Sequence, residues 1–142
     1  MDGANLTQEF ARLVRGRYCS VRAPLVVERP QLREALMQER DVAEVLDMAR
    51  NADIAIVGIG SVVSGFSSLV RAGFLQEENL LALREAGAVG DICARHFDIY
   101  GRELPIDLNQ RVVSVGLTAI KNIPLVIGIA GGKEKAEAFW AL

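Results

Sequence analysis

Two short apolar runs, each followed by glycines, constrain this chain more than any other feature. Residues 53–57 end in Ile-Ala-Ile-Val, and residues 125–130 read Leu-Val-Ile-Gly-Ile-Ala. Both runs have the length of strands, and continuous apolar sequence is typical of strands buried on both faces of a parallel sheet. Glycines follow each run, at 58 and 60 and again at 131 and 132. The chain is therefore predicted to form a sheet whose strands end in glycine-rich loops.

Helical segments alternate with these runs and with other strand-like segments. Apolar residues at helical spacing, capping residues and terminal glycines predict helices at 5–15, 31–37, 41–51, 67–71, 76–86, 118–122 and 133–142. Further strands are predicted at 18–27, 89–98 and 111–117. Such alternation is typical of an α/β fold, in which a sheet is layered with flanking helices.

Size, charge and the cysteines exclude several classes of protein. The 142 residues suit one domain, and the hydrophobic 51% is spread along the chain without a run of membrane-spanning length. The net charge is −2 with both signs interleaved, so no surface for nucleic acid is indicated. Cys19 and Cys93 lack metal-ligand spacing and are expected to be reduced core thiols, with a disulfide as the alternative. We expect a cytoplasmic protein with no cofactor, metal or membrane segment.

The segment after the second apolar run combines two glycines with two lysines. Gly131 and Gly132 let the backbone approach a ligand, and N–H groups at the start of the following helix are free to bind an anion. Lys133 and Lys135 are unfavourable in a first helical turn by roughly 0.3–1 kcal/mol, and an anion between them would reverse that sign. The residues alone also allow a simple turn in which Glu134 and solvent screen both lysines. An anion site is the interpretation we favour.

Two other segments carry candidate ligand contacts. Gly58, Gly60 and Ser61 could line a phosphate or sugar pocket, but they match neither a dinucleotide fingerprint nor a P-loop, and a tight strand-to-helix connection explains them equally well. Asp91 lies in an apolar run between glycines, so a buried carboxylate there must accept from backbone N–H groups or from ligand hydroxyls. The only histidine, His96, is expected to be partly exposed and non-catalytic. No catalytic residue is predicted.

Several motifs occur together and in a characteristic order. They are Gly16-Arg17-Tyr18, Val21-Arg22-Ala23-Pro24-Leu25, residues 52–61, Gly87-Ala88-Val89-Gly90-Asp91-Ile92-Cys93, Phe97-Asp98, Leu108-Asn109-Gln110-Arg111 and residues 129–136. Across nearly the whole chain, this set resembles the effector-binding domain of the SorC/DeoR-type sugar-responsive bacterial transcriptional regulators. The resemblance implies a Rossmann-like layered sheet with flanking helices, like that of ribose-phosphate isomerases and glucosamine-phosphate deaminases.

The resemblance also implies a ligand and the residues that contact it. Regulators of this family bind a phosphorylated sugar, and the aspartate of a Gly-Asp-Ile motif and a lysine of a Gly-Gly-x-x-Lys motif contact it. These positions are Asp91 and Lys135 here. Residues 58–61 would border the same pocket. A homo-oligomer, either dimer or tetramer, and DNA binding through a separate N-terminal helix-turn-helix are further implications.

The chain departs from the family pattern in extent. We expect residues 1–142 to form one effector-binding domain, shortened at both ends, without the helix-turn-helix, the upstream glycine-rich strand or the final strand and helix. A sugar-phosphate isomerase or deaminase is the alternative. In those resembling enzymes an Asp-Gly-His segment follows the Gly-Ile-Gly strand, but Val62 and Val63 stand there and offer no general base. A pure oligomerisation domain is a third possibility, which the glycine-and-lysine segment disfavours.

Overall fold

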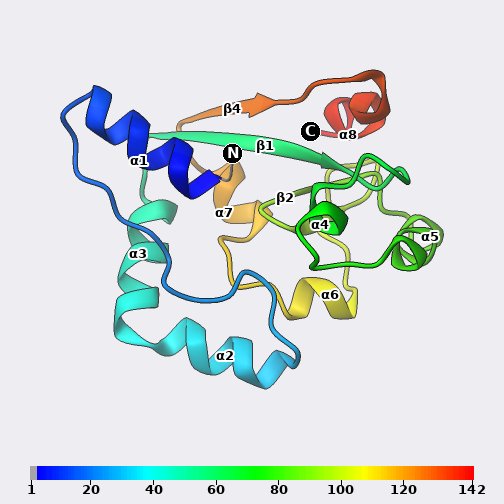
Figure 1. Ribbon diagram of the computed structural model, residues 1–142, viewed down its shortest axis with the longest axis horizontal. Helices are drawn as coiled ribbons and strands as arrows, with labels where there is room; N and C mark the ends of the chain where they lie inside the picture. Colours follow the sequence, from blue (N-terminus) through cyan, green and yellow to red (C-terminus); the bar gives the residue numbers. More distant parts are fainter. Residues whose placement is uncertain (1–2) are drawn as a thin grey trace.

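The computed structural model describes residues 3–142 as helices packed around a mixed sheet (Figure 1). In chain order the elements are α1 (Gly3–Leu13), α2 (Pro30–Gln38), α3 (Arg40–Arg50), β1 (Ile54–Ser61), α4 (Ser68–Arg71), α5 (Glu77–Glu85), β2 (Gly90–Ile92), β3 (Arg95–Phe97), α6 (Asp107–Gln110), α7 (Leu117–Lys121), β4 (Leu125–Ile129), the 3-10 helix η1 (Lys133–Lys135) and α8 (Ala136–Trp140). The predicted α/β class is confirmed. Every predicted helix forms at about its predicted place, although the last one begins as η1.

The strand order of the sheet is β3-β2-β1-β4. β1 and β4 are parallel, with Gly58 opposite Ile129. β2 pairs antiparallel with β1, and β3 pairs antiparallel with β2. Because parallel strands end at the same edge of a sheet, the glycine-rich loops after β1 and β4 are neighbours. The register also places Asp91 of β2 opposite Gly60, near the end of β1.

Residues 89–98, predicted as one strand, form a tight hairpin instead. Cys93 and Ala94 join β2 to β3, with φ angles of 52° and 64°. Two successive left-handed residues match the twist of the flanking strands in a two-residue turn, where Gly, Asn and Asp are the usual residues. The turn carries none of those residue types, so the chain reversal left no signal in the sequence.

The two other predicted strands, 18–27 and 111–117, pair only at one isolated bridge between Val26 and Val112. Pro24 has no backbone N–H to contribute to a ladder. Most of residues 111–117 form an extended link between α6 and α7, and the carbonyl groups of this link accept hydrogen bonds from arginine side chains.

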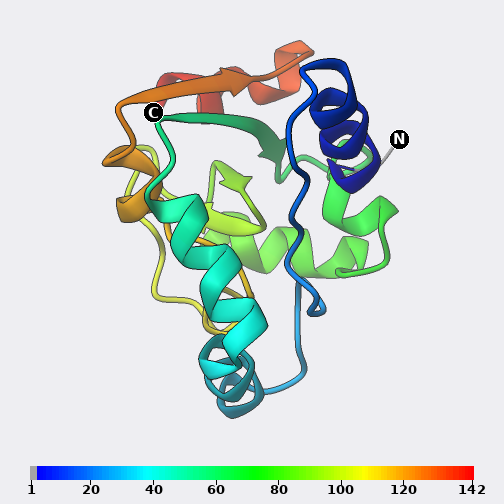
Figure 2. The same ribbon diagram turned by 90° about the vertical axis from the view of Figure 1, so that its left-hand side faces the viewer.

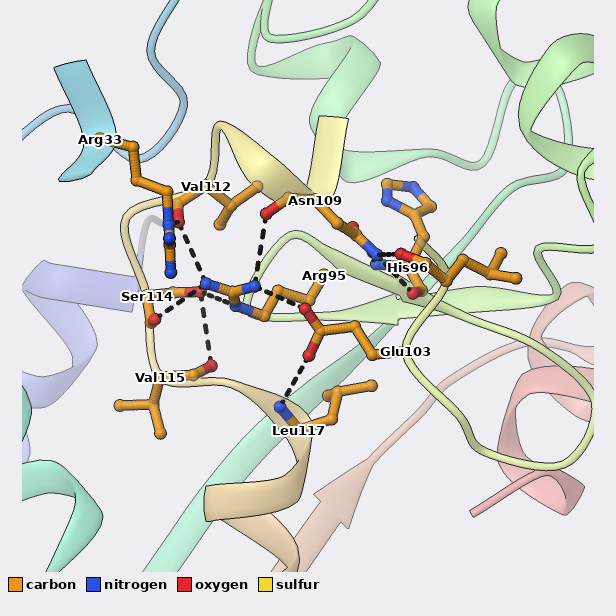
Figure 3. A network of polar contacts seen from close by, with 10 residues as sticks. Arg33, Arg95, His96, Glu103, Asn109, Val112, Ser114, Val115 and Leu117 are labelled. Atoms are coloured by element: carbon orange, nitrogen blue, oxygen red, sulfur yellow. Dashed lines mark hydrogen bonds and ion pairs between the residues drawn. The ribbon is translucent and has the colours of Figure 1, made fainter. Parts of the chain in front are cut away.

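The guanidinium of Arg95 is the centre of this polar network (Figure 3). It donates to the carbonyl oxygens of Val112 and Ser114, both at 3.2 Å, and to Ser114 Oγ at 3.0 Å. It also forms an ion pair with Glu103, whose other carboxylate oxygen accepts from the Leu117 N–H at 3.1 Å. Arg95 thereby ties β3 to the start of α7 and takes up the backbone acceptors that a strand would have used.

The prediction that β1 and β4 are buried on both faces is wrong. All five residues of β4 are exposed, and Ile54 and Ile56 of β1 are 55% and 57% exposed. Figure 2 shows β4 near the top of the molecule, and within residues 3–142 it is an edge strand of the sheet. The opposite face of β1 is buried, where Val57 and Ile59 join the main core with residues of α3, α7 and α8. Continuous apolar sequence therefore predicts strands correctly here. It does not predict whether other elements cover one face of a strand or both.

The apolar face of α1 is exposed as well. Its side chains at positions 6, 10 and 13 are 54–69% exposed.

A second core cluster lies beneath α4, α5 and α6 and includes Ala94 of the hairpin turn. Both cysteines are free, as predicted, but they are exposed. The prediction that they lie in the core is therefore wrong. The sheet is thus well packed around the hairpin and the end of β1, which is where the candidate site lies.

Candidate functional site

The end of β1, the middle of β2 and the turn η1 meet at one place and carry four of the predicted contacts. Asp91 lies opposite Gly60. Ser61 Oγ donates to the Glu134 carbonyl oxygen at 3.2 Å and accepts from the Val63 N–H at 3.1 Å. Ser61 therefore fastens the end of β1 to η1 and holds Lys135 close enough to act electrostatically on Asp91.

Gly60 is required at its position because the Asp91 carboxyl group occupies the space beside it. A Cβ atom on Gly60 would overlap both carboxylate oxygens of Asp91. Gly58, two residues earlier on the same strand, is exposed, and a Cβ there would meet nothing within 4 Å. The two glycines that the sequence pattern grouped together therefore differ. One makes room for the carboxylate, and the other borders open space on the same face of the strand.

Asp91 is a buried carboxylate that lacks a full set of donors. It is 5% exposed, and within residues 3–142 its Oδ1 has no hydrogen-bond partner. Burial raises the pKa of Asp91 to about 6, although the backbone of Ala94 and the charge of Lys135 act in the opposite direction. A buried acceptor without a donor is unfavourable by about 1–3 kcal/mol. The sequence predicts that this carboxylate accepts from backbone N–H groups or from ligand hydroxyls, and Oδ1 is the oxygen that lacks a partner among residues 3–142.

Asp91→Asn should raise the free energy of unfolding at pH 8 by up to about 3 kcal/mol, because it removes a buried charge. The carboxyl pKa is about 6 in the folded protein against an ordinary 3.8. The destabilisation is therefore fully present above about pH 6 and disappears as the pH falls below about 4. Urea unfolding at several pH values should show the gain shrinking over that range. An equal gain at every pH would contradict a titrating carboxylate.

The loop after β4 is the other half of the predicted site. Gly131 and Gly132 are exposed, and Gly132 has a φ of 95° that a glycine adopts without strain. The Glu134 carboxylate lies against Gly132, in the space that a Cβ would fill. Lys135 is half-buried and Lys133 is exposed. An anion at this turn would replace the Glu134 carboxylate beside the glycine. Since η1 has only three residues, the lysine charges rather than a helix dipole would attract it.

His96 is the residue whose placement the sequence analysis missed. It is 1% exposed, against the expected partial exposure, and it lies directly opposite Asp91 in the hairpin. Burial lowers the pKa of His96 to about 4, so the imidazole is neutral at physiological pH. A turn recognised at 93–94 would have predicted this pairing, but no residue type in the sequence marks that turn.

Two of the cavities elsewhere illustrate other linings. One of about 700 Å³ opens on the covered face of the sheet and is mostly apolar, with Ile59, Ile120 and Trp140 among its walls. Another of about 320 Å³ includes Tyr18 and Arg22. Neither includes a residue predicted to bind the ligand. Among residues 3–142, no cluster of His, Cys, Asp and Glu side chains is placed to hold a metal ion. No helix in that part of the chain has the length and apolar character to cross a bilayer.

Known proteins match both the sequence and the fold. A family model described as "Putative sugar-binding domain" matches residues 2–142. The transcriptional regulator LsrR of Enterobacter sp. (strain 638) is 35% identical over 128 residues, which cover 87% of this chain and 40% of that protein. LsrR of Escherichia coli (strain K12) is 38% identical over 128 residues, with the same coverage of each chain. This chain spans about 40% of the length of these curated relatives.

Solved structures of transcriptional regulators match the fold of this chain. A DeoR family transcriptional regulator from Listeria monocytogenes superposes with a TM-score of 0.90 at 30% identity, covering 97% of this chain and 56% of that one. The full-length sorbitol operon regulator SorC from Klebsiella pneumoniae gives a TM-score of 0.85 at 25% identity, covering 97% and 44%. These relatives are named as regulators, as the resemblance predicted, and not as isomerases or deaminases. The chain belongs to the sugar-binding domain family of SorC/DeoR-type transcriptional regulators.

Proposed function

We propose that this chain senses a small phosphorylated sugar, with Asp91 and Lys135 as the principal contacts. The observation that carries the proposal is the buried Asp91 Oδ1, which has no partner among residues 3–142 although Lys135 acts on the same carboxylate. A sugar supplies hydroxyl donors for such an acceptor, and a phosphate supplies the negative charge that a lysine recognises. Support also comes from relatives named as transcriptional regulators and from a family described by sugar binding.

Each remaining residue has a physical role in this proposal. Gly58 leaves open space on the strand face that it shares with Gly60, and Gly60 makes room for the carboxylate. Ser61 holds η1 against the end of β1. Gly131 and Gly132 present exposed backbone beside the lysine, where a phosphate would displace the Glu134 carboxylate.

The sensing role extends to partners outside this chain. A cytoplasmic homo-oligomer, dimer or tetramer, would change its assembly when sugar binds. A separate helix-turn-helix would then change its affinity for DNA. The exposed edge of β4 offers unpaired backbone groups of the kind that mediate strand pairing between subunits.

Thermal unfolding tests the sugar site directly. Ribose 5-phosphate, fructose 6-phosphate and glucosamine 6-phosphate are compared with ribose, fructose and glucosamine. A panel member present at 100 times its Kd should add about 2.7 kcal/mol and raise the melting temperature by roughly 5–10 °C. Lys135→Ala should abolish the shift because it removes the cation near Asp91.

Lys133→Ala is the matched control, since it removes the same charge from the exposed lysine of the same turn. The control should keep most of the shift. If no phosphorylated sugar stabilises the chain, or if the two lysine variants lose the shift equally, the proposed site is wrong.

A further inference from the structure

Asp91 and His96 lie directly opposite each other in the β2–β3 hairpin. Such residues project to the same face of an antiparallel pair, with Cβ atoms about 4.5–5.5 Å apart. They are 5% and 1% exposed, and within residues 3–142 neither Asp91 Oδ1 nor His96 Nδ1 has a hydrogen-bond partner. Two buried titratable groups therefore lie side by side, each with one unused polar atom.

The Asn109 side chain holds the backbone of His96 and also acts on its ring. The Asn109 Oδ1 atom accepts from the His96 N–H at 2.8 Å, and Asn109 Nδ2 donates to the His96 carbonyl at 2.9 Å. Figure 3 shows the imidazole pointing away from the Arg95 guanidinium, which is paired with Glu103. The thiol of Cys93, in the turn, is another titratable group that the Asp91 charge influences, besides Lys135.

Burial reverses the order in which these two groups take up a proton. In water an imidazole takes up its proton near pH 6.5 and a carboxylate near pH 3.9, so the imidazole is charged first. Here burial raises the pKa of Asp91 to about 6 and lowers that of His96 to about 4. Lys135 and the backbone of Ala94 favour the carboxylate, and Asn109 and Ala94 favour the imidazolium, but burial outweighs them. The first proton therefore goes to the carboxyl group.

We propose that His96 is a positioning residue of the sugar site: it shares a buried environment with Asp91 in which a single proton resides on the carboxyl group while the imidazole stays neutral. This inference rests on the proposed function. Once Asp91 has lost the proton, Oδ1 accepts from a sugar hydroxyl. When it holds the proton, the carboxyl group donates instead. The buried environment that the two residues share thus sets the pH at which the site changes from acceptor to donor.

Nuclear magnetic resonance of the ligand-free protein tests the pair. Because His96 is the only histidine, its two ring nitrogens give one assignable pair of ¹⁵N signals. We expect these shifts to inflect near pH 6, as Asp91 takes up its proton, and to reach imidazolium values only near pH 4. Asp91→Asn should remove the first inflection and keep the second.

Asp98→Asn is the control, since Asp98 is a nearby turn carboxylate paired with the exposed Arg102. It should keep both inflections. Charging of the imidazole near pH 6.5 in the unsubstituted protein would overturn the inference. So would an inflection near pH 6 that survives Asp91→Asn.

Unfolding equilibria give a second, independent test. Between about pH 4 and 6, folding takes up a proton at Asp91 and releases one from His96, so their effects on the folding constant cancel. Relative to the unsubstituted protein, the folding constant of Asp91→Asn should fall about tenfold for each pH unit from 6 towards 4. That of His96→Gln should rise about tenfold for each pH unit over the same range. Slopes of the same sign in both variants would overturn the inference.

Sugar affinity is measured separately, using the panel member that gives the largest thermal shift. Its phosphate also titrates near pH 6, so each variant is compared with the unsubstituted protein at every pH. His96→Gln should move the midpoint of the pH profile, whereas Lys135→Ala should lower affinity at every pH without moving it. Unchanged midpoints would overturn the role of His96 and leave the sensor standing. If no sugar binds while the ¹⁵N inflection is present, the sensor fails and the proton pair stands.

Discussion

Arg95→Ala should lower the free energy of unfolding by about 3–5 kcal/mol, a large part of the stability of a domain of this size. The guanidinium is 6% exposed and bonds three backbone carbonyl oxygens, the Ser114 hydroxyl and the Glu103 carboxylate. Alanine would leave a partly buried carboxylate without its cation and the carbonyl groups of Asn109 and Ser114 without the arginine donor, whereas Val112 would still accept from Arg33. Urea unfolding followed by far-ultraviolet circular dichroism measures the change.

Arg102→Ala is the matched control for this prediction. Arg102 also pairs with a carboxylate, that of Asp98, but its side chain is 71% exposed. An exposed ion pair contributes about 0–1 kcal/mol. Arg95→Lys should fall between the two, because an ammonium keeps the charge but cannot reach several acceptors in a plane. Similar losses for Arg95→Ala and Arg102→Ala would show that the buried network stabilises the fold no more than a surface pair.

Apart from the short α6, which was not predicted, the helices were predictable because their signals are local. Pro30 at the start of α2 and Gly87 after α5 act through their own backbone geometry, and periodic apolar residues such as Val42 and Leu46 identify the buried face of α3. None of these signals depends on a distant partner. The same holds for β1 and β4, whose apolar runs were recognised as strands.

Burial of the strands was not predictable, because it depends on elements far away in the sequence. Ile54 and Ile56 carry the same apolar signal as Val57 and Ile59, yet only the second pair is covered. The site shows the same division. The flanking apolar residues predict a buried Asp91, whereas its pairing with His96 depends on a turn that no local residue type marks.

The arginine network is the other feature that pattern analysis could not supply. Residues 111–117 alternate in a way that is typical of a strand, but Arg95 occupies carbonyl groups that a ladder would need. The contact joins positions separated by 17 and 19 residues. Here a buried side chain donates the hydrogen bonds that a neighbouring strand would have donated. Such a tertiary contact produces no periodic pattern in the sequence.

Gly60→Ala should abolish sugar binding and lower the free energy of unfolding by about 1–3 kcal/mol, because the new methyl group would overlap the Asp91 carboxylate. The Gly60–Asp91 pairing fixes the backbones of β1 and β2 relative to each other, so the carboxylate must rotate away or the strands must separate. Either response moves the acceptor on which the proposed site depends. Urea unfolding and the thermal-shift panel measure the two losses.

Gly58→Ala separates this overlap from the general effect of adding a methyl group to β1. A Cβ at Gly58 meets nothing within 4 Å, and the residue faces the same side of the strand as Gly60. Gly58→Ala should therefore leave stability within about 0.5 kcal/mol of the unsubstituted protein or raise it slightly. The double variant Gly60→Ala/Asp91→Ala supplies the decisive comparison. With the carboxylate gone, the methyl group at position 60 should destabilise the fold much less than it does beside Asp91. If the loss at position 60 is the same in both backgrounds, the carboxylate does not occupy the space beside Gly60, and that glycine serves the backbone alone.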